Sequence, residues 1–193
     1  MERSLCERSF ILIKKMYMYN VCMLQRKEQL LTERLVLKSI DEKDKKDLLE
    51  IANNPLVKKG YMILDFASAE EEEKFFQKLR NFSLDKERFV FGVYSKNKII
   101  GFLNDVHREN LTIEVGYFFA PKEWNKGYAT EALKAAINEL FRMGFEVVQA
   151  GHFEENLASG RVMQKCGMKH IEKEEIVEYR NVKHRCVFYE IRK

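Results

Sequence analysis

The sequence predicts a single α/β (α+β) domain, with a mixed, mostly antiparallel, twisted sheet flanked by about four helices. Three observations support this. Strand patterns come in runs instead of alternating strictly with helices, the length of 193 residues suits one domain, and no repeat at a fixed period is visible. From the N-terminus, the predicted order of elements is β-α-α-β-β-β-α-β-α-β-β.

The N-terminal residues 1–30 differ in pattern from the rest of the chain. Apolar and charged residues alternate there without a clean period, and four methionines lie close together: Met1, Met16, Met18 and Met23. We expect this segment to be an appendage, poorly ordered or upstream of the true start, and residues 31–193 to form the domain. One hypothesis is that translation starts at Met23, which the mass of the natively expressed protein tests.

The first half of the domain is predicted to hold one strand and two helices. Arg34 to Lys38 have a strand pattern, and Asp41 offers an N-cap to a helix that ends at Asn53-Asn54-Pro55. A capping-box pattern at Ser68-Ala69-Glu70-Glu71 predicts the second helix, whose apolar positions are Phe75, Phe76, Leu79 and Phe82.

The second half is predicted to begin with an antiparallel meander of strands at 88–94, 99–106 and 111–119. Pro121 ends the third strand, and residues 127–142 then show the clearest helical period of the chain, with Gly144 as the C-terminal stop. The remaining predicted elements are a strand at 145–153, a short helix at 156–166 closed by Gly167, and strands at 171–178 and 186–191.

Composition excludes several classes of protein. Hydrophobic residues make up 46% of the chain and charged residues 33%, with 2 Pro and 9 Gly, so collagen-like and fully disordered chains are excluded. The net charge of +4 is small and evenly spread, which argues against dedicated nucleic-acid binding. The four cysteines and four histidines lack zinc-ligand spacing, so we expect reduced thiols and no metal.

The segment before the long helix is the strongest candidate for chemistry. Gly127 and Ala129 would leave backbone N–H groups at the helix start open to a ligand, where the helix dipole places partial positive charge. These residues alone are equally compatible with an anion site and an ordinary turn. The motifs G-x-x-x-x-G-K-[ST] and G-x-G-x-x-G are absent, so a pyrophosphate-bearing cofactor of another kind is favoured.

Three motifs follow one another in the second half of the chain. They are Glu114-Val115-Gly116-Tyr117, then Pro121-x-x-Trp124-x-Lys126-Gly127-Tyr128-Ala129-Thr130-Glu131-Ala132-Leu133, then Asn156-x-Ala158-Ser159-x-Arg161-Val162-Met163-x-Lys165-x-Gly167-Met168. Together they resemble the GNAT superfamily of acetyl-CoA-dependent N-acetyltransferases, and more narrowly the branch that includes the ribosomal-protein alanine N-acetyltransferases. The resemblance runs from Thr32 to Tyr189 and implies a single-domain GNAT-like fold.

The resemblance implies a site for acetyl-CoA as co-substrate. The turn from Asn125 to Thr130 would wrap the pyrophosphate with main-chain amides, and the end of the preceding strand would bind the pantetheine as a pseudo-strand. Trp124 replaces the usual glutamine or arginine of the pyrophosphate motif, so binding would rest on the backbone. The implied cofactor-binding residues are Phe118, Phe119, Ala120, Asn125, Lys126, Gly127, Tyr128, Ala129, Thr130, Asn156, Ser159 and Arg161.

Two glutamates are candidates for the base, since an amine attacks a thioester only when unprotonated. By the two-residue period, Glu114 shares a strand face with Gly116 and Phe118 beside the expected thioester, so it could accept a proton through a water; a solvated strand carboxylate is the alternative. Glu178, before Tyr179-Arg180-Asn181, resembles a glutamate of the ribosomal-protein branch. The sequence does not rank the two.

The group that would assist the leaving thiolate is less clear. Many GNAT enzymes carry a tyrosine seven residues after the asparagine of the last motif, and this chain has Met163 there. The branch resemblance implies Ser159 instead, as a catalytic group or a relay for water, and a helix-capping serine is the alternative. A backbone N–H near Phe118 is expected to meet the oxyanion.

The sequence therefore predicts a cytoplasmic enzyme that transfers an acetyl group directly from acetyl-CoA to a primary amine. A protein N-terminal α-amine is favoured by the branch resemblance, and polyamines and antibiotic-like amines remain open as acceptors. Two other classes remain: a catalytically silent acyl-CoA-binding regulatory module, and a protein-interaction or RNA-associated domain on the same scaffold. We expect no membrane partner, and a homodimer is compatible with the sequence.

Overall fold

The computed structural model describes residues 24–193, in which every predicted element is present. The expectation for residues 1–23, including a start at Met23, lies outside the described residues. The predicted elements are β2 (Val36–Lys38), α2 (Lys45–Asn53), α4 (Ala69–Leu84), β3 (Phe91–Ser95), β4 (Lys98–Glu109), β5 (Thr112–Phe119), α5 (Tyr128–Met143), β6 (Val147–Phe153), α6 (Leu157–Lys165), β7 (Lys169–Tyr179) and β8 (Val182–Arg192).

The structure adds elements that the sequence analysis missed: β1 (Gln29–Leu31), α3 (Pro55–Lys58) and two short 3-10 helices, η1 (Glu42–Asp44) and η2 (Pro121–Glu123). Pro55 was expected to end a helix, but it also begins α3, because a proline at the first helical position gives up an N–H that would be unpaired there. Asn54 caps α3 by accepting from the Leu56 N–H at 2.9 Å.

The described part of the expected appendage takes part in the fold. β1 pairs antiparallel with β2, and Leu30 is buried in the core. Arg26 is buried too, with its guanidinium donating to the Arg88 carbonyl at 2.8 Å and lying over the Phe91 ring. The folded part thus begins before residue 31.

The sheet is mixed and mostly antiparallel, as predicted. Its eight described strands run in the order β1-β2-β3-β4-β5-β6-β8-β7, and β5 and β6 are the parallel pair. The meander β3-β4-β5 is confirmed, and its first hairpin turns at Lys96 and Asn97, both of which have positive φ. Gly144 and Gly167, with φ of 109° and 83°, follow α5 and α6 as the predicted stops.

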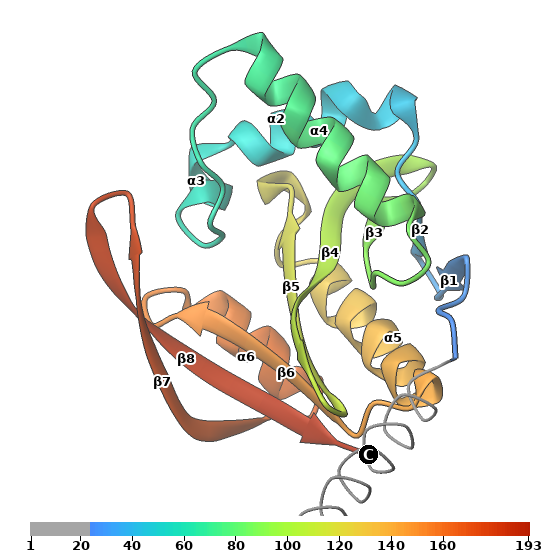
Figure 1. Cartoon of the computed structure of the whole chain (residues 1–193), viewed down its shortest axis with the longest axis vertical. Helices are drawn as coiled ribbons and strands as arrows, with labels where there is room; N and C mark the ends of the chain where they lie inside the picture. The colour runs from blue at the N-terminus through green and yellow to red at the C-terminus, as the bar shows by residue number, and fades with distance from the viewer. Residues whose placement is uncertain (1–23) are drawn as a thin grey trace, which may run out of the picture.

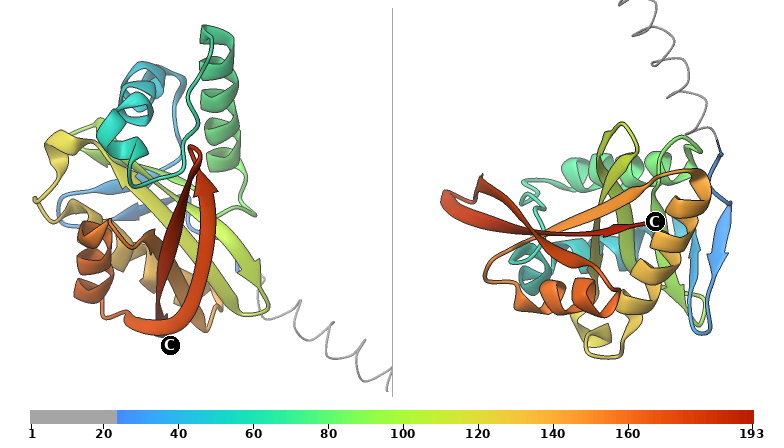
Figure 2. Two further views of the ribbon diagram at one scale, coloured as in Figure 1. Left: turned by 90° about the vertical axis from the view of Figure 1, so that its left-hand side faces the viewer. Right: turned by 90° about the horizontal axis from the view of Figure 1, so that it is seen from below.

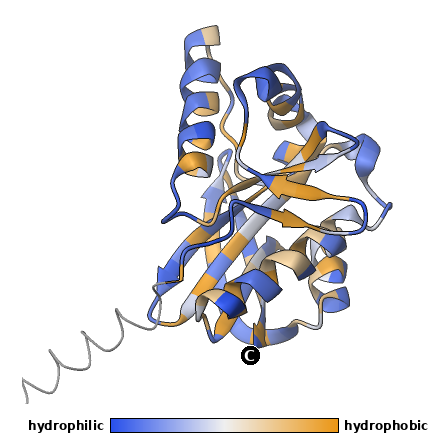
Figure 3. Cartoon of the chain, turned by 90° about the vertical axis from the view of Figure 1, so that its right-hand side faces the viewer, coloured by the Kyte–Doolittle hydropathy of each residue, from blue (hydrophilic) through white to orange (hydrophobic). Residues whose placement is uncertain are grey.

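Helices cover both faces of the sheet. Helices α2, α3 and α4 pack on one face and α5 and α6 on the other, with a hydrophobic cluster on each side (Figures 1 and 2). Apolar residues concentrate in the strands, whereas α4 is largely hydrophilic outside its buried positions Phe76 and Leu79 (Figure 3). Within residues 24–193, none of the helices has the length and apolar character needed to cross a bilayer.

The parallel pair β5 and β6 separates partway along its length. The two strands are paired through Thr112–Val147, Ile113–Val148 and Glu114–Gln149. Beyond Glu114, β5 continues beside β4 as far as Phe119, while β6 continues beside β8. A wedge-shaped gap therefore opens inside the sheet, and one backbone edge of β5 faces it.

Candidate active site

A cavity of about 630 Å³ lies at the gap between β5 and β6. Its walls come from the end of β5, the loop into α5, the starts of α5 and α6, and the segment around α3. Ten of the twelve predicted cofactor-binding residues line it: Phe118, Phe119, Asn125, Gly127, Tyr128, Ala129, Thr130, Asn156, Ser159 and Arg161. Three motifs distant in sequence thus meet at one hollow.

The N-terminus of α5 opens into this cavity. Its N-cap residue Gly127 has a φ of 83°, and no side chain of the described residues caps the helix. The first bond of the helix runs from the Glu131 N–H to the Gly127 carbonyl, at 3.0 Å. The N–H groups of Tyr128, Ala129 and Thr130 precede that bond, so they are free to bind an anion where the helix dipole is positive.

The free edge of β5 belongs to Tyr117 and Phe119, the two neighbours of Phe118, near which the N–H for the oxyanion is predicted. The Ala120 N–H donates to the Ile100 carbonyl of β4 at 2.9 Å, so alternation turns the N–H and C=O of Phe118 toward β4 as well. Those of Tyr117 and Phe119 point toward the gap. The Trp124 indole N–H donates to the Phe119 carbonyl at 2.9 Å, in agreement with this direction.

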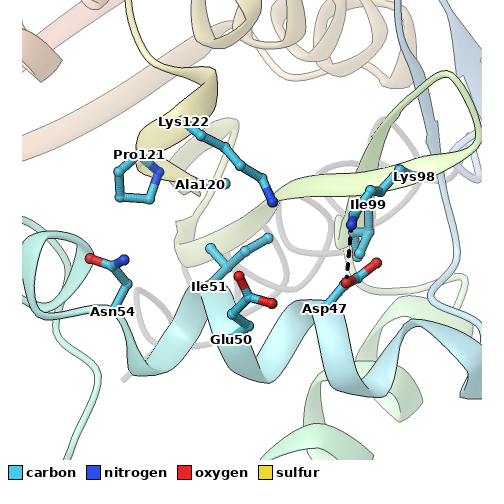
Figure 4. A pocket seen from close by; sticks show the side chains of 9 residues that line it. All are labelled: Asp47, Glu50, Ile51, Asn54, Lys98, Ile99, Ala120, Pro121 and Lys122. Carbon is cyan, nitrogen blue, oxygen red and sulfur yellow. Dashed lines mark ion pairs between the residues drawn. The ribbon is translucent and has the colours of Figure 1, made fainter.

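Two predicted cofactor-binding residues do not line the large cavity. The Lys126 ammonium is turned to the Glu123 carboxylate, at 2.9 Å. Ala120 instead lines a second cavity of about 280 Å³ between α2, β4 and η2, beside Ile51 and crossed by the ion pair of Lys98 with Asp47 at 3.3 Å (Figure 4). The side chain of Lys126 and the backbone of Ala120 are therefore already engaged elsewhere.

At the start of α6, the cap is Asn156 and not Ser159. The Asn156 side chain accepts from the Ser159 N–H at 3.3 Å. Met163, at the position of the missing tyrosine, is 1% exposed and packs in the core, so it offers no proton donor. The alternative role of Ser159 as a cap is wrong.

Two tyrosine hydroxyls that the sequence analysis did not single out lie at the cavity. Tyr117 donates to the Ser159 carbonyl at 3.3 Å and so joins β5 to α6. Tyr61, in the loop after α3, donates to the Asn104 side chain at 2.6 Å and packs edge-on against Phe118. Burial raises the pKa of both phenols, so both stay protonated across the physiological range.

The two candidate bases have different surroundings, and neither lines the large cavity. The Glu114 side chain is 16% exposed and lies on the same face of β5 as Gly116 and Phe118, with the Lys173 ammonium of β7 at 3.5 Å. Glu178 is exposed and pairs in register with Lys183 near the tip of the β7–β8 hairpin. Burial therefore distinguishes the two carboxylates that the sequence did not rank.

Near that tip, the β7–β8 hairpin reaches the loop after α3, on the side of the sheet that carries α2 and α4 (Figure 1). The Tyr179 hydroxyl donates to the Ile63 carbonyl at 2.7 Å. Asp65 pairs with both Arg180 of the hairpin and Lys58 of α3. The hairpin contacts join segments more than a hundred residues apart, and the sequence analysis did not predict them.

Comparison with known proteins identifies the family. The sequence model of the acetyltransferase (GNAT) domain family matches residues 34–169 of this chain. An uncharacterized N-acetyltransferase, p20 of Bacillus licheniformis, is 30% identical over 115 residues, which cover 58% of this chain and 65% of that protein. A GNAT-family acetyltransferase structure from Bacillus anthracis superposes with a TM-score of 0.73 at 27% identity, covering 85% of this chain and 98% of the other.

A further structural neighbour shares the fold. A ribosomal L7/L12 alpha-N-protein acetyltransferase, RimL, in complex with coenzyme A has a TM-score of 0.74 at 19% identity, and the match covers 86% of this chain and 98% of that one. At this identity the likeness concerns the fold. The chain belongs to the GNAT acetyltransferase family. It is an acetyl-CoA-dependent N-acetyltransferase, with ribosomal-protein acetyltransferases among its structural neighbours.

Proposed function

We propose that this enzyme binds acetyl-CoA in the cavity between β5 and α6 and transfers the acetyl group to the α-amine of a protein or peptide. One observation carries the proposal: the uncapped N-terminus of α5 and the free edge of β5 open into the same hollow of about 630 Å³. The first suits a pyrophosphate and the second suits an extended amide-bearing arm. These are the two ends of one cofactor.

The cofactor is held mainly by backbone groups. The N–H groups of Tyr128, Ala129 and Thr130 bind the pyrophosphate, and Asn125 and Gly127, both with positive φ, turn the chain so that these groups converge. The free N–H groups of Tyr117 and Phe119 meet the pantetheine and the carbonyl of the thioester. Arg161 and Ser159 complete the wall on α6.

Glu114 accepts the proton of the attacking amine, through a water. Its side chain lies near the point where β5 leaves β6, on the face of β5 that turns toward Tyr61 and the hairpin, and Lys173 holds it there. Glu178 lies at the exposed hairpin and contacts the acceptor instead. Alignment of the amine and the thioester supplies much of the rate, with effective molarities of about 10⁵–10⁸ M available to well-oriented groups.

The leaving thiolate needs no strong acid. The conjugate thiol has a pKa near 8.5, so it can leave as an anion that a hydrogen bond stabilises. Tyr117 supplies that bond when its hydroxyl turns from the Ser159 carbonyl, to which it donates at 3.3 Å in the free protein, toward the sulfur. This takes the place of the family tyrosine for which the chain has Met163, and Ser159 contributes its position on the cavity wall.

A terminal α-amine is the acceptor that suits such a modest base. At pH 7 about one α-amine in ten is neutral, against fewer than about one lysine amine in a thousand, since their pKa values are about 8 and 10.4. The fold is shared with RimL, which is described as an alpha-N-protein acetyltransferase. The name of that neighbour supports the same acceptor class.

The experiment is a free-thiol assay of purified protein with acetyl-CoA and three acceptors: a peptide with a free N-terminal alanine or serine, the same peptide blocked at its N-terminus but carrying a lysine, and spermidine. Release of CoA with the first peptide, and a mass gain of one acetyl group at its N-terminus, supports the proposal. Release with spermidine alone would make the enzyme a small-molecule acetyltransferase. Binding of acetyl-CoA without release for any amine would identify a silent module.

A further inference from the structure

Arg34, in the loop between β1 and β2, is connected to the turn that begins α5 by several independent contacts. Its Nη1 donates to the Lys126 carbonyl at 3.0 Å, and its guanidinium lies over the Tyr128 ring at 4.8 Å. A Cβ atom added to Gly127 would come within 3.3 Å of Nη2. The guanidinium therefore lies directly against the backbone of the proposed pyrophosphate turn.

Glu131, one turn into α5, fixes the orientation of this guanidinium. Its Oε2 accepts from Nε of Arg34 at 2.7 Å and pairs with Nη2 at 2.6 Å. Its Oε1 accepts from the backbone N–H of Arg34 at 2.9 Å and from the Thr32 hydroxyl at 2.6 Å. Burial opposes ionisation of Glu131, but these hydrogen bonds outweigh it and hold its pKa below the ordinary value.

All the charged groups of this cluster are engaged within the protein. Each of the three guanidinium nitrogens of Arg34 has an acceptor, and both oxygens of Glu131 have donors. These contacts use three of the five N–H donors of Arg34 and fix its guanidinium against the turn. Its contacts with Lys126 and Tyr128 restrain the residues that flank Gly127, the position where the backbone enters the left-handed region.

We propose that Arg34 and Glu131 form a clamp that holds the 125–128 turn in its anion-binding conformation before the cofactor arrives. Arg34 is a positioning residue, and this inference rests on the proposed cofactor site. Without the clamp, the turn becomes ordered only when acetyl-CoA binds. The entropy lost in that ordering then weakens the binding of acetyl-CoA. The acceptor site and the chemical step lie elsewhere and keep their properties.

The test compares the kinetics of wild type and Arg34→Ala. The variant is expected to raise the KM and the dissociation constant for acetyl-CoA by about tenfold, the equivalent of one charge-assisted hydrogen bond. Both kcat and the KM for the amine stay as in wild type. Glu131→Ala has the same effect. The double variant binds acetyl-CoA no more weakly than either single variant does, because the two residues act as one unit.

Two further variants separate the clamp from general stability. Arg192→Ala removes an exposed arginine that also pairs with a glutamate, Glu190 at 2.7 Å, and leaves both KM values unchanged. Arg34→Lys keeps the charge but cannot contact the Glu131 carboxylate through two nitrogens, so its KM for acetyl-CoA is also expected to rise. It replaces Arg34→Ala in the test if that variant does not fold.

The outcomes separate this inference from the function on which it rests. If wild type binds acetyl-CoA and Arg34→Ala and Arg34→Lys bind it equally well, the clamp is refuted and the cofactor site stands. A fall in kcat with no change in affinity also refutes it. If wild type does not bind acetyl-CoA, the proposed function fails first.

Discussion

The two ends of the active site are built differently. The key groups of the proposed cofactor end are backbone N–H groups of one continuous stretch, β5 to α5, set by local geometry at Gly127, with a further wall from α6 and support from Arg34. The proposed acceptor end comes from the loop after α3 and the β7–β8 hairpin, which are joined by contacts such as the hydrogen bond from the Tyr179 hydroxyl to the Ile63 carbonyl. Backbone groups set by local geometry suit a ligand that does not vary, such as acetyl-CoA. Side-chain contacts between distant segments can differ between enzymes that act on different acceptors.

The largest expected effect comes from filling the cofactor end. In Gly127→Val/Ala129→Leu, side chains cover the N–H groups at the start of α5, and Gly127 must also hold a φ of 83° that valine rarely adopts. Binding of acetyl-CoA is expected to be lost in a calorimetric titration.

Gly144→Val is the matched control, because Gly144 has a φ of 109° at the other end of the same helix. It is expected to lower stability by about 1–2 kcal/mol and to leave the dissociation constant unchanged. Equal weakening by both variants would mean that α5 stability, and not the open helix end, controls binding.

The next largest effect is expected in the kcat of the two glutamate variants, Glu114→Gln and Glu178→Gln. Glu114→Gln is expected to lower kcat by about 10²-fold, the lower range for a general base. Glu178→Gln, at the exposed hairpin, changes kcat by less than about threefold. A larger loss in Glu178→Gln than in Glu114→Gln would move the base to the acceptor end.

A smaller effect is expected from loosening the acceptor end. Tyr179→Phe removes the hydrogen bond to the Ile63 carbonyl and keeps the ring packed against Phe153. The KM for the amine is expected to rise by about fivefold, as for loss of one neutral hydrogen bond, while the KM for acetyl-CoA stays constant. A change in the acetyl-CoA KM instead would show that the two ends are not independent.

The smallest effect concerns acid stability. Glu131 and Glu139 both have lowered pKa values. Burial raises each pKa, but hydrogen bonds lower it further: those of Glu131 come from Thr32 and Arg34, and those of Glu139 from Arg142 and Lys27. A lowered folded pKa stabilises the protein above the ordinary value of 4.5, and this is lost as pH falls through the folded value. Glu131→Gln should therefore lower Tm at pH 7 more than at pH 3.5, and an equal change at both pH values would contradict this.

The difference between local and long-range contacts also explains what could be predicted from the sequence. Helix α5 and its turn were predictable because period, glycine and capping chemistry are local, and ten of the twelve predicted cofactor-binding residues line one cavity. The place of Ala120 at the smaller cavity, with its N–H donating to Ile100, was not predictable because hydrogen-bond direction at the end of β5 depends on the register with β4. Tyr61 was missed because it lies in a loop whose contact with Asn104 spans 43 residues, and no local pattern encodes such a contact.

The measurement that tests the account most directly is a calorimetric titration of the wild-type protein with acetyl-CoA, repeated with Gly127→Val/Ala129→Leu and Gly144→Val. Wild type and Gly144→Val are expected to bind saturably at one site per chain, and the double variant is expected not to bind. Binding that survives in the folded double variant would contradict the placement of the pyrophosphate at the start of α5. Absence of binding in wild type would contradict the proposed cofactor site itself.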